Sequence, residues 1–411
     1  MNTPPNPACE KIGSLASATS PDALATNEGF WAMVRAEFAR PEDFVHLEYG
    51  YYHPACHAVI ATEIATITEA QRRGSHYKRH EMNADREAAR TDLARVAGAS
   101  PEEVILTRNT TEAFNIILRG LPLARGDEIV HSDLDYGGVV ETLEQRAQRD
   151  GVVLRPVTLP PEPSTDAEII ARFTAAITPR TRAILITHVI NHTGQVLPVK
   201  ALCALGRSRG LEVIVDAAHS FAQFAFTVGE LDCDYLGASL HKWLAAPLGT
   251  GLLYVRRSRI ATLEPLFSDT GQPVDNIRKL EHFGNRPDSA HRGLREAIRL
   301  HEAIGAPAKQ ARLRFLQHRW TSIARTLPGV RVLTSADPSR HGAIGTFAIE
   351  GMEPKAIVDR LMSEHGIFVN AVDHPRAPCV RVTPGLATSL EDIDRLLAAL
   401  RSITAAVANS P

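Results

Sequence analysis

Short apolar runs alternate with longer amphipathic segments through the middle of the chain, and this alternation limits the possible folds most strongly. The runs EVIL, EIV and RAILI each precede a segment of helical periodicity: TTEAFNIILRGL, VVETLEQRAQRDG and VKALCALGRSRG. LEVIV, YLGASL and GTGLLYV are further apolar runs of strand length. Strands that alternate with helices pair in parallel, and the helices cover the sheet. The sequence therefore predicts an α/β fold with a mainly parallel sheet.

The pattern changes after about Gly293. LREAIRLHEAIG and RLRFLQHRWTSIARTL have helical periodicity, and the short runs VRVLT and GTFAIE have strand character. We expect a large domain over residues 45–290 and a smaller α+β C-terminal domain over residues 291–411. Residues 1–28 are small, polar and proline-containing, without the apolar stretch of a signal peptide, so we expect a flexible leader there.

The composition favours a soluble protein with a small-molecule partner. The 411 residues are 44% hydrophobic, and 45 basic residues against 47 acidic ones give a net charge of −2. Such a balance provides no field that attracts nucleic acid or an anionic membrane, and no run has the length of a membrane helix. The five cysteines are scattered without a C-x-x-C pair, which favours a reducing, cytoplasmic location.

Polar residues follow nearly every predicted strand, at the edge where ligands of parallel sheets bind. Lys242 follows YLGASL and lies between this run and the next apolar one. A desolvated amine there has a lowered pKa and forms Schiff bases, whereas the alternative is an ordinary surface lysine. Asp216 ends LEVIVD, as a buried anion or as a helix cap or turn residue. A Schiff-base lysine with an aspartate at a pyridinium nitrogen is what pyridoxal phosphate requires, so we predict that cofactor.

Other strand ends offer groups for the rest of such a cofactor. Thr110 and Thr111 begin a predicted helix, whose N-terminus favours a phosphate, although a simple capping box is the alternative. Ser239 and His241 supply further donors close to the lysine. Weaker signals at strand ends come from three more residues, whose alternative roles are in turns or in the core: Tyr136, Asn191 and His219.

The order TTEAFN, THVINHTG, VDAAHS and SLHKW resembles the class V branch of the fold-type I pyridoxal phosphate enzymes. The resemblance runs from about Leu47 to the C-terminal helix. It implies that Lys242 binds the cofactor covalently, that Asp216 contacts the pyridinium nitrogen and that Tyr136 stacks on the ring. It further implies phosphate contacts from Thr110, Thr111, Ser239 and His241, and positions for Asn191 and His219 beside the ring hydroxyl.

Two segments resemble the isopenicillin N epimerase-like proteins within class V. GNRPDSAH, residues 284–291, is similar to the GTRDPSA segment that reaches the cofactor phosphate of the neighbouring subunit in that family. The resemblance implies phosphate contact by Asn285 across the interface of a homodimer, although Asn replaces Thr and the Pro-Asp order is reversed. CVRVTPGLATSLEDIDRL is similar to the family's C-terminal segment, which implies that Arg381 binds the substrate carboxylate.

We therefore expect a pyridoxal phosphate enzyme acting at Cα of an amino acid or amino-acid conjugate, similar to isopenicillin N epimerases. The alternatives are a carbon-sulfur lyase on a cysteine conjugate, similar to hercynylcysteine sulfoxide lyase, an aminotransferase, or a non-catalytic binding module that would not need Lys242 and Asp216. Cys379 lies in a predicted strand and not on a loop, so we do not expect a persulfide-forming desulfurase. His76 and His80 lack an evident third ligand, and no metal site is predicted.

Overall fold

The structure is a computed structural model that describes residues 7–162, 164–284, 287 and 289–408. Among these residues, seven strands form the main sheet in the order β2-β8-β7-β6-β5-β3-β4. Their bounds are β2 Val104–Thr107, β3 Glu128–Ser132, β4 Val153–Val157, β5 Thr181–Thr187, β6 Glu212–Asp216, β7 Tyr235–Ser239 and β8 Gly251–Val255. β8 runs antiparallel to both of its neighbours and the remaining pairs are parallel. The predicted α/β fold with a mainly parallel sheet is confirmed.

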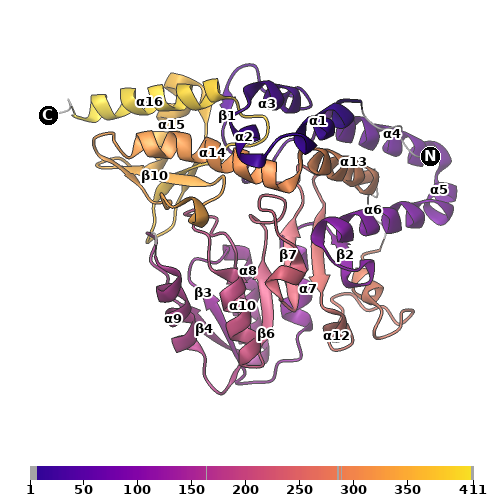
Figure 1. The fold of residues 1–411 in the computed structure, drawn as a ribbon. Coiled ribbons are helices and arrows are strands. Elements are labelled where there is room, and N and C mark those ends of the chain that lie inside the picture. Colours follow the sequence, from indigo (N-terminus) through magenta and orange to yellow (C-terminus); the bar gives the residue numbers. More distant parts are fainter. Residues whose placement is uncertain (1–6, 163, 285–286, 288, 409–411) are drawn as a thin grey trace.

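Helices connect these strands and cover the sheet (Figure 1). They are α6 Met82–Ala97, α7 Thr110–Gly120, α8 Gly137–Asp150, α9 Asp166–Ala176, α10 Val199–Ser208, α11 Val228–Leu231 and α12 Arg257–Ile260, with the 3-10 turns Pro101–Glu103 and Ile277–Glu281. β2, β3, β6 in its last four residues, β7 and β8 are buried throughout, as expected for strands covered on both faces.

The C-terminal region has a sheet of its own. Among the described residues, four antiparallel strands have the order β12-β13-β10-β9: β9 Val330–Val332, β10 Gly345–Ile349, β12 Asn370–Val372 and β13 Cys379–Val382. α13 Ser289–Ile304, α14 Ala306–Ala324, α15 Pro354–His365 and α16 Leu390–Ala408 are the helices of this part, with the 3-10 turn Pro338–Arg340. The expected helices and strands are therefore present. α13 packs on α6 and on α4 His57–Arg73, so the division at residue 290 stays a prediction.

The N-terminal segment corrects one expectation. Residues 7–28 are not a flexible leader, because they contain α1 Pro7–Ser17 and α2 Pro21–Ala25 and lead into α3 Glu28–Arg35. α1 packs on α13 and α2 packs on α14. Pro7 and Pro21 are the first residues of their helices, where a proline removes no intrahelical hydrogen bond. The prolines that suggested an irregular leader therefore begin helices.

The segment after α3 links the two parts of the chain. β1 Val45–His46 pairs in parallel with β11 Ile367–Phe368, and an isolated bridge joins Glu48 to Thr383. α4 and the short helix α5 Ser75–His80 follow, and in Figure 1 they lie on the same side as α1 and α13. In the described part of the chain, no helix is long and apolar enough to cross a membrane.

Candidate functional site

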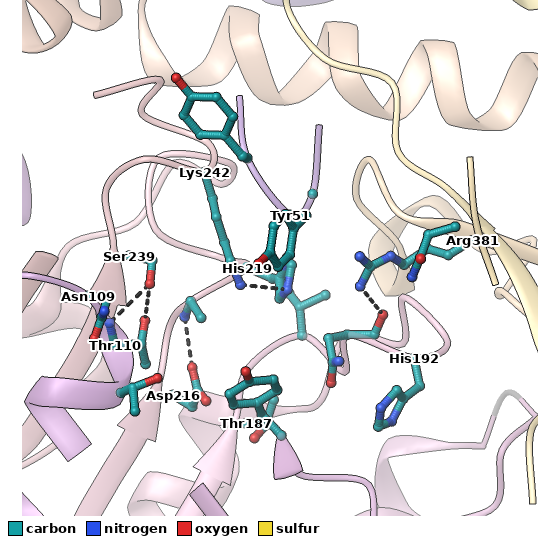
Figure 2. Close-up of a pocket in the computed structure, with 18 of the residues that line it drawn as sticks. Tyr51, Asn109, Thr110, Thr187, His192, Asp216, His219, Ser239, Lys242 and Arg381 are labelled. Atoms are coloured by element: carbon teal, nitrogen blue, oxygen red, sulfur yellow. Dashed lines mark hydrogen bonds between the residues drawn. The ribbon is translucent and has the colours of Figure 1, made fainter. Parts of the chain in front are cut away.

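Every predicted site residue that the structure describes lines one cavity of about 470 Å³. The cavity opens at the carboxyl ends of the main strands, where ligands of parallel α/β sheets bind. Its lining includes Thr110, Thr111, Tyr136, Asn191, Asp216, His219, Ser239, His241, Lys242 and Arg381. Figure 2 shows several of these side chains pointing toward a common space. Asn285 lies outside the described residues, so its predicted phosphate contact stays a prediction.

Lys242 lies on a tight turn between β7 and β8. The turn closes through the Ala246 N–H, which donates to the Leu240 carbonyl at 3.1 Å. The Lys242 Nζ lies 3.0 Å from Nε2 of His219 (Figure 2). Burial lowers the pKa of Lys242 to about 8, and the negative charge of Asp216 opposes this shift. About one tenth of the amine is therefore unprotonated, and nucleophilic, at pH 7.

Asp216 is the last residue of β6 and is 4% exposed. Its Oδ1 accepts a hydrogen bond of 2.8 Å from the Ala218 N–H. Burial raises the pKa of Asp216 to about 6, while this hydrogen bond and the charge of Lys242 lower it. The carboxylate is thus a buried anion whose ionised form a cation in the cavity would stabilise. It is not the N-cap of a helix, but its hydrogen bond with the N–H two residues on is a turn contact, so the turn alternative holds beside the buried anion.

The part of the cavity next to the start of α7 has donors suited to an anion (Figure 2). Asn109 caps α7, since its side chain accepts from the Glu112 N–H at 2.8 Å. Thr110 and Ser239 are joined by two hydrogen bonds, of 3.0 Å from the Thr110 N–H and 2.7 Å between the hydroxyls. Thr111 follows in the first turn, where the helix dipole and backbone N–H groups favour a negative charge. The predicted phosphate residues are therefore brought together.

Among the described residues, four buried polar atoms of the lining make no hydrogen bond, and two of them belong to residues predicted to contact the cofactor. Oδ1 of Asn191 and Nδ1 of His241 are buried and make no hydrogen bond within the described residues. Burial lowers the pKa of His241 to about 4, so its imidazole is neutral. Buried polar atoms are seldom left unpaired, and these two belong to the residues predicted to contact the ring hydroxyl and the phosphate. The lining therefore fits a phosphorylated pyridine cofactor.

Tyr136 is half exposed at the cavity mouth, whereas Arg381 is buried in the cavity wall. Tyr136 precedes α8, lines the cavity and is 49% exposed, so its ring is available at the cavity mouth. Arg381 is 6% exposed and forms an ion pair with the equally buried Glu48. Its Nη1 also donates to the Asn191 carbonyl at 3.2 Å. Its Nε is buried without a partner among the described residues.

Sequence reasoning missed several residues of the lining. Thr187 ends β5, and its hydroxyl donates to Oδ1 of Asp135 at 2.7 Å. This threonine follows an apolar run, so the rule that selected Asp216 would have selected it too. His192 and Asn109 also lie in segments that follow predicted strands. Less sequence signal marks the other missed residues, which are Gly50, Tyr51, Tyr52, Val189, Ala218, Leu248 and residues 370–373.

No candidate metal centre is found in the described part of the chain. Groups of three or more His, Cys, Asp or Glu residues placed to hold an ion are absent among these residues. His76 and His80 are neighbours on α5, with ring centroids 4.6 Å apart, and lie outside the lining of the cavity.

Comparisons with known proteins agree with this geometry. The chain is 32% identical to the isopenicillin N epimerase of Streptomyces clavuligerus and 30% identical to that of Amycolatopsis lactamdurans, in each case over 77% of this chain and 84% of the relative. It is also 26% identical to a probable cysteine desulfurase of Xylella fastidiosa (strain 9a5c), over 95% of this chain and 97% of the relative. The desulfurases therefore conflict with the expectation that excluded this class.

The fold is shared with solved structures. A C-DES variant with glycine covalently linked to its pyridoxal phosphate cofactor has a TM-score of 0.81 at 23% identity, covering 89% of this chain and 98% of that structure. The sequence also matches the aminotransferase class-V family over residues 55–396. The chain therefore belongs to the aminotransferase class-V family of fold-type I enzymes, with pyridoxal 5'-phosphate as its cofactor.

Proposed function

We propose that this protein catalyses a reaction at Cα of an amino acid or amino-acid conjugate, in the manner of isopenicillin N epimerases. The observation that carries the proposal is the partly unprotonated Lys242 amine, in one cavity with the buried Asp216 carboxylate. The 32% identity to an epimerase favours this branch of the family. When bound, pyridoxal phosphate supplies an aldehyde that reacts with amines and a ring that accepts the electron pair from Cα.

Lys242 has two roles in this proposal. Its unprotonated amine attaches the cofactor, and after an amino acid replaces it there, the same amine removes the proton from Cα. A pKa of about 8 suits both roles, because such a group is readily protonated and deprotonated near neutral pH. Asp216 keeps the pyridine nitrogen protonated, since the buried carboxylate is stabilised by a positive charge facing it.

The remaining residues hold the cofactor and the substrate. Thr110, Thr111, Ser239 and His241 bind the phosphate at the start of α7. Asn191 and His219 face the ring hydroxyl, and Tyr136 stacks on the ring at the cavity mouth. Arg381 lines the cavity and binds the substrate carboxylate through its guanidinium, because each Nη keeps a second N–H beside the one donated to Glu48 or to the Asn191 carbonyl.

Persulfide formation is not part of the proposed function. A sulfur acceptor must be an accessible thiolate, whereas Cys379 begins β13 and is fully buried. Burial raises the pKa of Cys379 to about 12, and its Sγ donates to the His192 carbonyl at 3.5 Å. Within the described residues, the lining of the cavity contains no cysteine. These observations favour the epimerase branch over the desulfurase branch, although desulfurases are among the relatives.

A panel of L-amino acids and cysteine conjugates in deuterated buffer tests the reaction type. Epimerisation introduces deuterium at Cα with inversion, whereas carbon-sulfur cleavage releases a keto acid with ammonia, and transamination releases a keto acid while the amino group stays on the cofactor. Lys242→Ala should abolish deuterium exchange and the borohydride-reducible adduct, while the exposed control Lys200→Ala should keep both. Products of carbon-sulfur cleavage or transamination without Cα inversion would assign the protein to the corresponding alternative.

A further inference from the structure

Trp243, the residue after Lys242, contacts the site through its indole N–H, which can only donate a hydrogen bond. Its indole Nε1 lies 3.3 Å from Nδ1 of His219, and both side chains are nearly fully buried. The two rings meet edge to face, with centroids 6.3 Å apart and an interplanar angle of 64°. An indole N–H donates and never accepts, so Nδ1 of His219 has to be the acceptor in this bond.

The position of the His219 proton follows from this bond. Burial lowers the pKa of His219 well below its usual value, so the imidazole is neutral and carries a single N–H. Since Nδ1 accepts from Trp243, the proton is on Nε2. Nε2 is the atom that lies 3.0 Å from the Lys242 Nζ, and an N–H there can donate only to an amine with a free lone pair. The bond from Trp243 therefore favours the unprotonated form of Lys242.

The opposite tautomer has the opposite effect on Lys242. With the proton on Nδ1, the N–H groups of His219 and Trp243 would face each other, and Nε2 would accept from a Lys242 ammonium. The indole N–H is thus the feature that distinguishes the two arrangements. The other groups act on Lys242 through burial and charge: Asp216 and Glu48 raise its pKa, Arg381 lowers it, and His241 is a further titratable neighbour.

A buried lysine fixes the backbone of Trp243 by a hydrogen bond. The Trp243 carbonyl accepts this hydrogen bond from Nζ of Lys309, a lysine of α14 that is 1% exposed. Ala245, two residues further along the turn, has a φ of 55°, a conformation that an alanine adopts only where the surroundings fix the backbone. Together these features keep the indole at a fixed position against His219.

We propose that Trp243 is a positioning residue that keeps His219 in the Nε2–H tautomer and thereby stabilises the free-amine form of Lys242 relative to its ammonium form. The inference rests on the proposed function only for the identity of Lys242 as the reactive amine. It concerns atoms of this chain alone, so it can be measured on the enzyme freed of its cofactor.

The first test is the tautomer itself. Nitrogen-15 NMR of apoenzyme labelled at histidine distinguishes protonated from unprotonated ring nitrogens, and loss of a signal in His219→Gln assigns that residue. We expect a protonated Nε2 and an unprotonated Nδ1 at pH 9.5, where most of Lys242 is the free amine. A proton on Nδ1, or on both nitrogens, would overturn the proposal. This measurement needs no Trp243 variant, so it stands if such a variant fails to fold.

The second test is the reactivity of Lys242 in Trp243→Phe apoenzyme, which keeps a buried ring but loses the indole N–H. Trace acetylation across a pH series, read by peptide mass spectrometry, should show a higher titration midpoint for Lys242. Labelling at pH 7 should fall about fivefold, the effect of one hydrogen bond. Trp320→Phe is the matched control, because Trp320 is fully buried and its Nε1 has no partner among the described residues.

An unchanged midpoint in Trp243→Phe, or an equal change in Trp320→Phe, would refute the role of the indole N–H. Failure of the proposed function gives a different result. In that case Lys242 of the wild-type apoenzyme would not form an adduct with added pyridoxal phosphate, whereas the tautomer of His219 would still be measured as before.

Discussion

Replacing Asp216 by Asn should make Lys242 a stronger nucleophile in the apoenzyme, although Asp216 is expected to be essential in the loaded enzyme. Burial lowers the pKa of Lys242 to about 8, and the carboxylate of Asp216 is the largest effect that opposes this shift. An asparagine is of similar size, and its carbonyl oxygen can still accept the 2.8 Å hydrogen bond from the Ala218 N–H. The substitution therefore removes a charge and little else.

The size of the effect follows from the titration of a single amine. With a pKa of about 8, about one tenth of Lys242 is unprotonated at pH 7, compared with about one in 2,500 for an ordinary lysine. A nearby opposite charge shifts a pKa by about 1–3 units. If removal of the Asp216 charge lowers the pKa of Lys242 by one unit, the pKa becomes about 7, and about half of the amine is unprotonated at pH 7. We therefore expect about fivefold faster labelling at that pH.

Trace acetylation of the apoenzyme between pH 6 and 10, followed by mass spectrometry of the Lys242 peptide, measures the midpoint. The midpoint is preferable to the absolute rate, because access through the cavity changes the rate at every pH alike. The exposed Lys200 provides an internal reference in the same digest. Asp394→Asn is the control variant, since it removes an exposed carboxylate on α16. A midpoint that rises or stays unchanged in Asp216→Asn would show that Asp216 does not act on Lys242 through its charge.

Three further predictions concern other parts of the chain. Burial lowers the pKa of Lys309 from 10.5 to about 7, so the unfolded chain binds more protons between these values and the free energy of unfolding rises with pH there. Lys309→Met should remove about 1.4 kcal/mol of this rise per pH unit, as measured by urea unfolding of both proteins at pH 7.5, 8.5 and 9.5. Cys379→Ala should keep most of the activity on the true substrate, whereas a persulfide on Cys379 after incubation with L-cysteine would move the protein to the desulfurases. Ile60, Ile64 and Ile67 form an apolar stripe on α4 with exposed fractions of 41%, 60% and 49%, and we expect the second subunit of a homodimer to cover it. Ile64→Asp should then weaken the dimer in sedimentation velocity, and an unchanged sedimentation coefficient would place the interface elsewhere.

The main sheet and the cofactor cavity follow closely from the sequence. The carboxyl ends of parallel strands meet at one edge, so residues selected only for following an apolar run were expected to lie together. Asp216 and Lys242 come from neighbouring strands and line the same cavity for this reason. The same reasoning fails for the N-terminal segment, because whether a short polar helix is stable depends on the surface it packs against. Ile12 of α1 is buried against α13, which lies far along the chain.

The hydrogen bonds of Trp243 with His219 and Lys309 could not be predicted from the sequence, because they too depend on contacts between distant parts of the chain. Trp243 is adjacent to Lys242 in sequence, and its polarity alone does not reveal which acceptor its indole finds. That acceptor, His219, is 24 residues away and is placed by the pairing of β6 with β7. The anchoring contact from Lys309 comes from a helix 66 residues further along. Local patterns specify strands and helices, whereas contacts of this kind require the packed structure.

Arg381 and Glu48 form a buried ion pair at the proposed substrate end of the cavity. The two residues are 333 positions apart and meet because β1 pairs with β11 and Glu48 bridges to Thr383. A buried arginine without a counter-charge would be strongly destabilising, so Glu48 is what allows Arg381 to lie in the cavity wall before substrate arrives. If Arg381 binds the substrate carboxylate as proposed, that carboxylate meets a guanidinium whose charge Glu48 already balances. In the proposed function, binding depends on the N–H groups of Arg381 that Glu48 and the Asn191 carbonyl leave available, and on how β1 holds the C-terminal sheet against the cavity. Substrate recognition is thereby tied to the contact between the N-terminal and C-terminal parts of the chain.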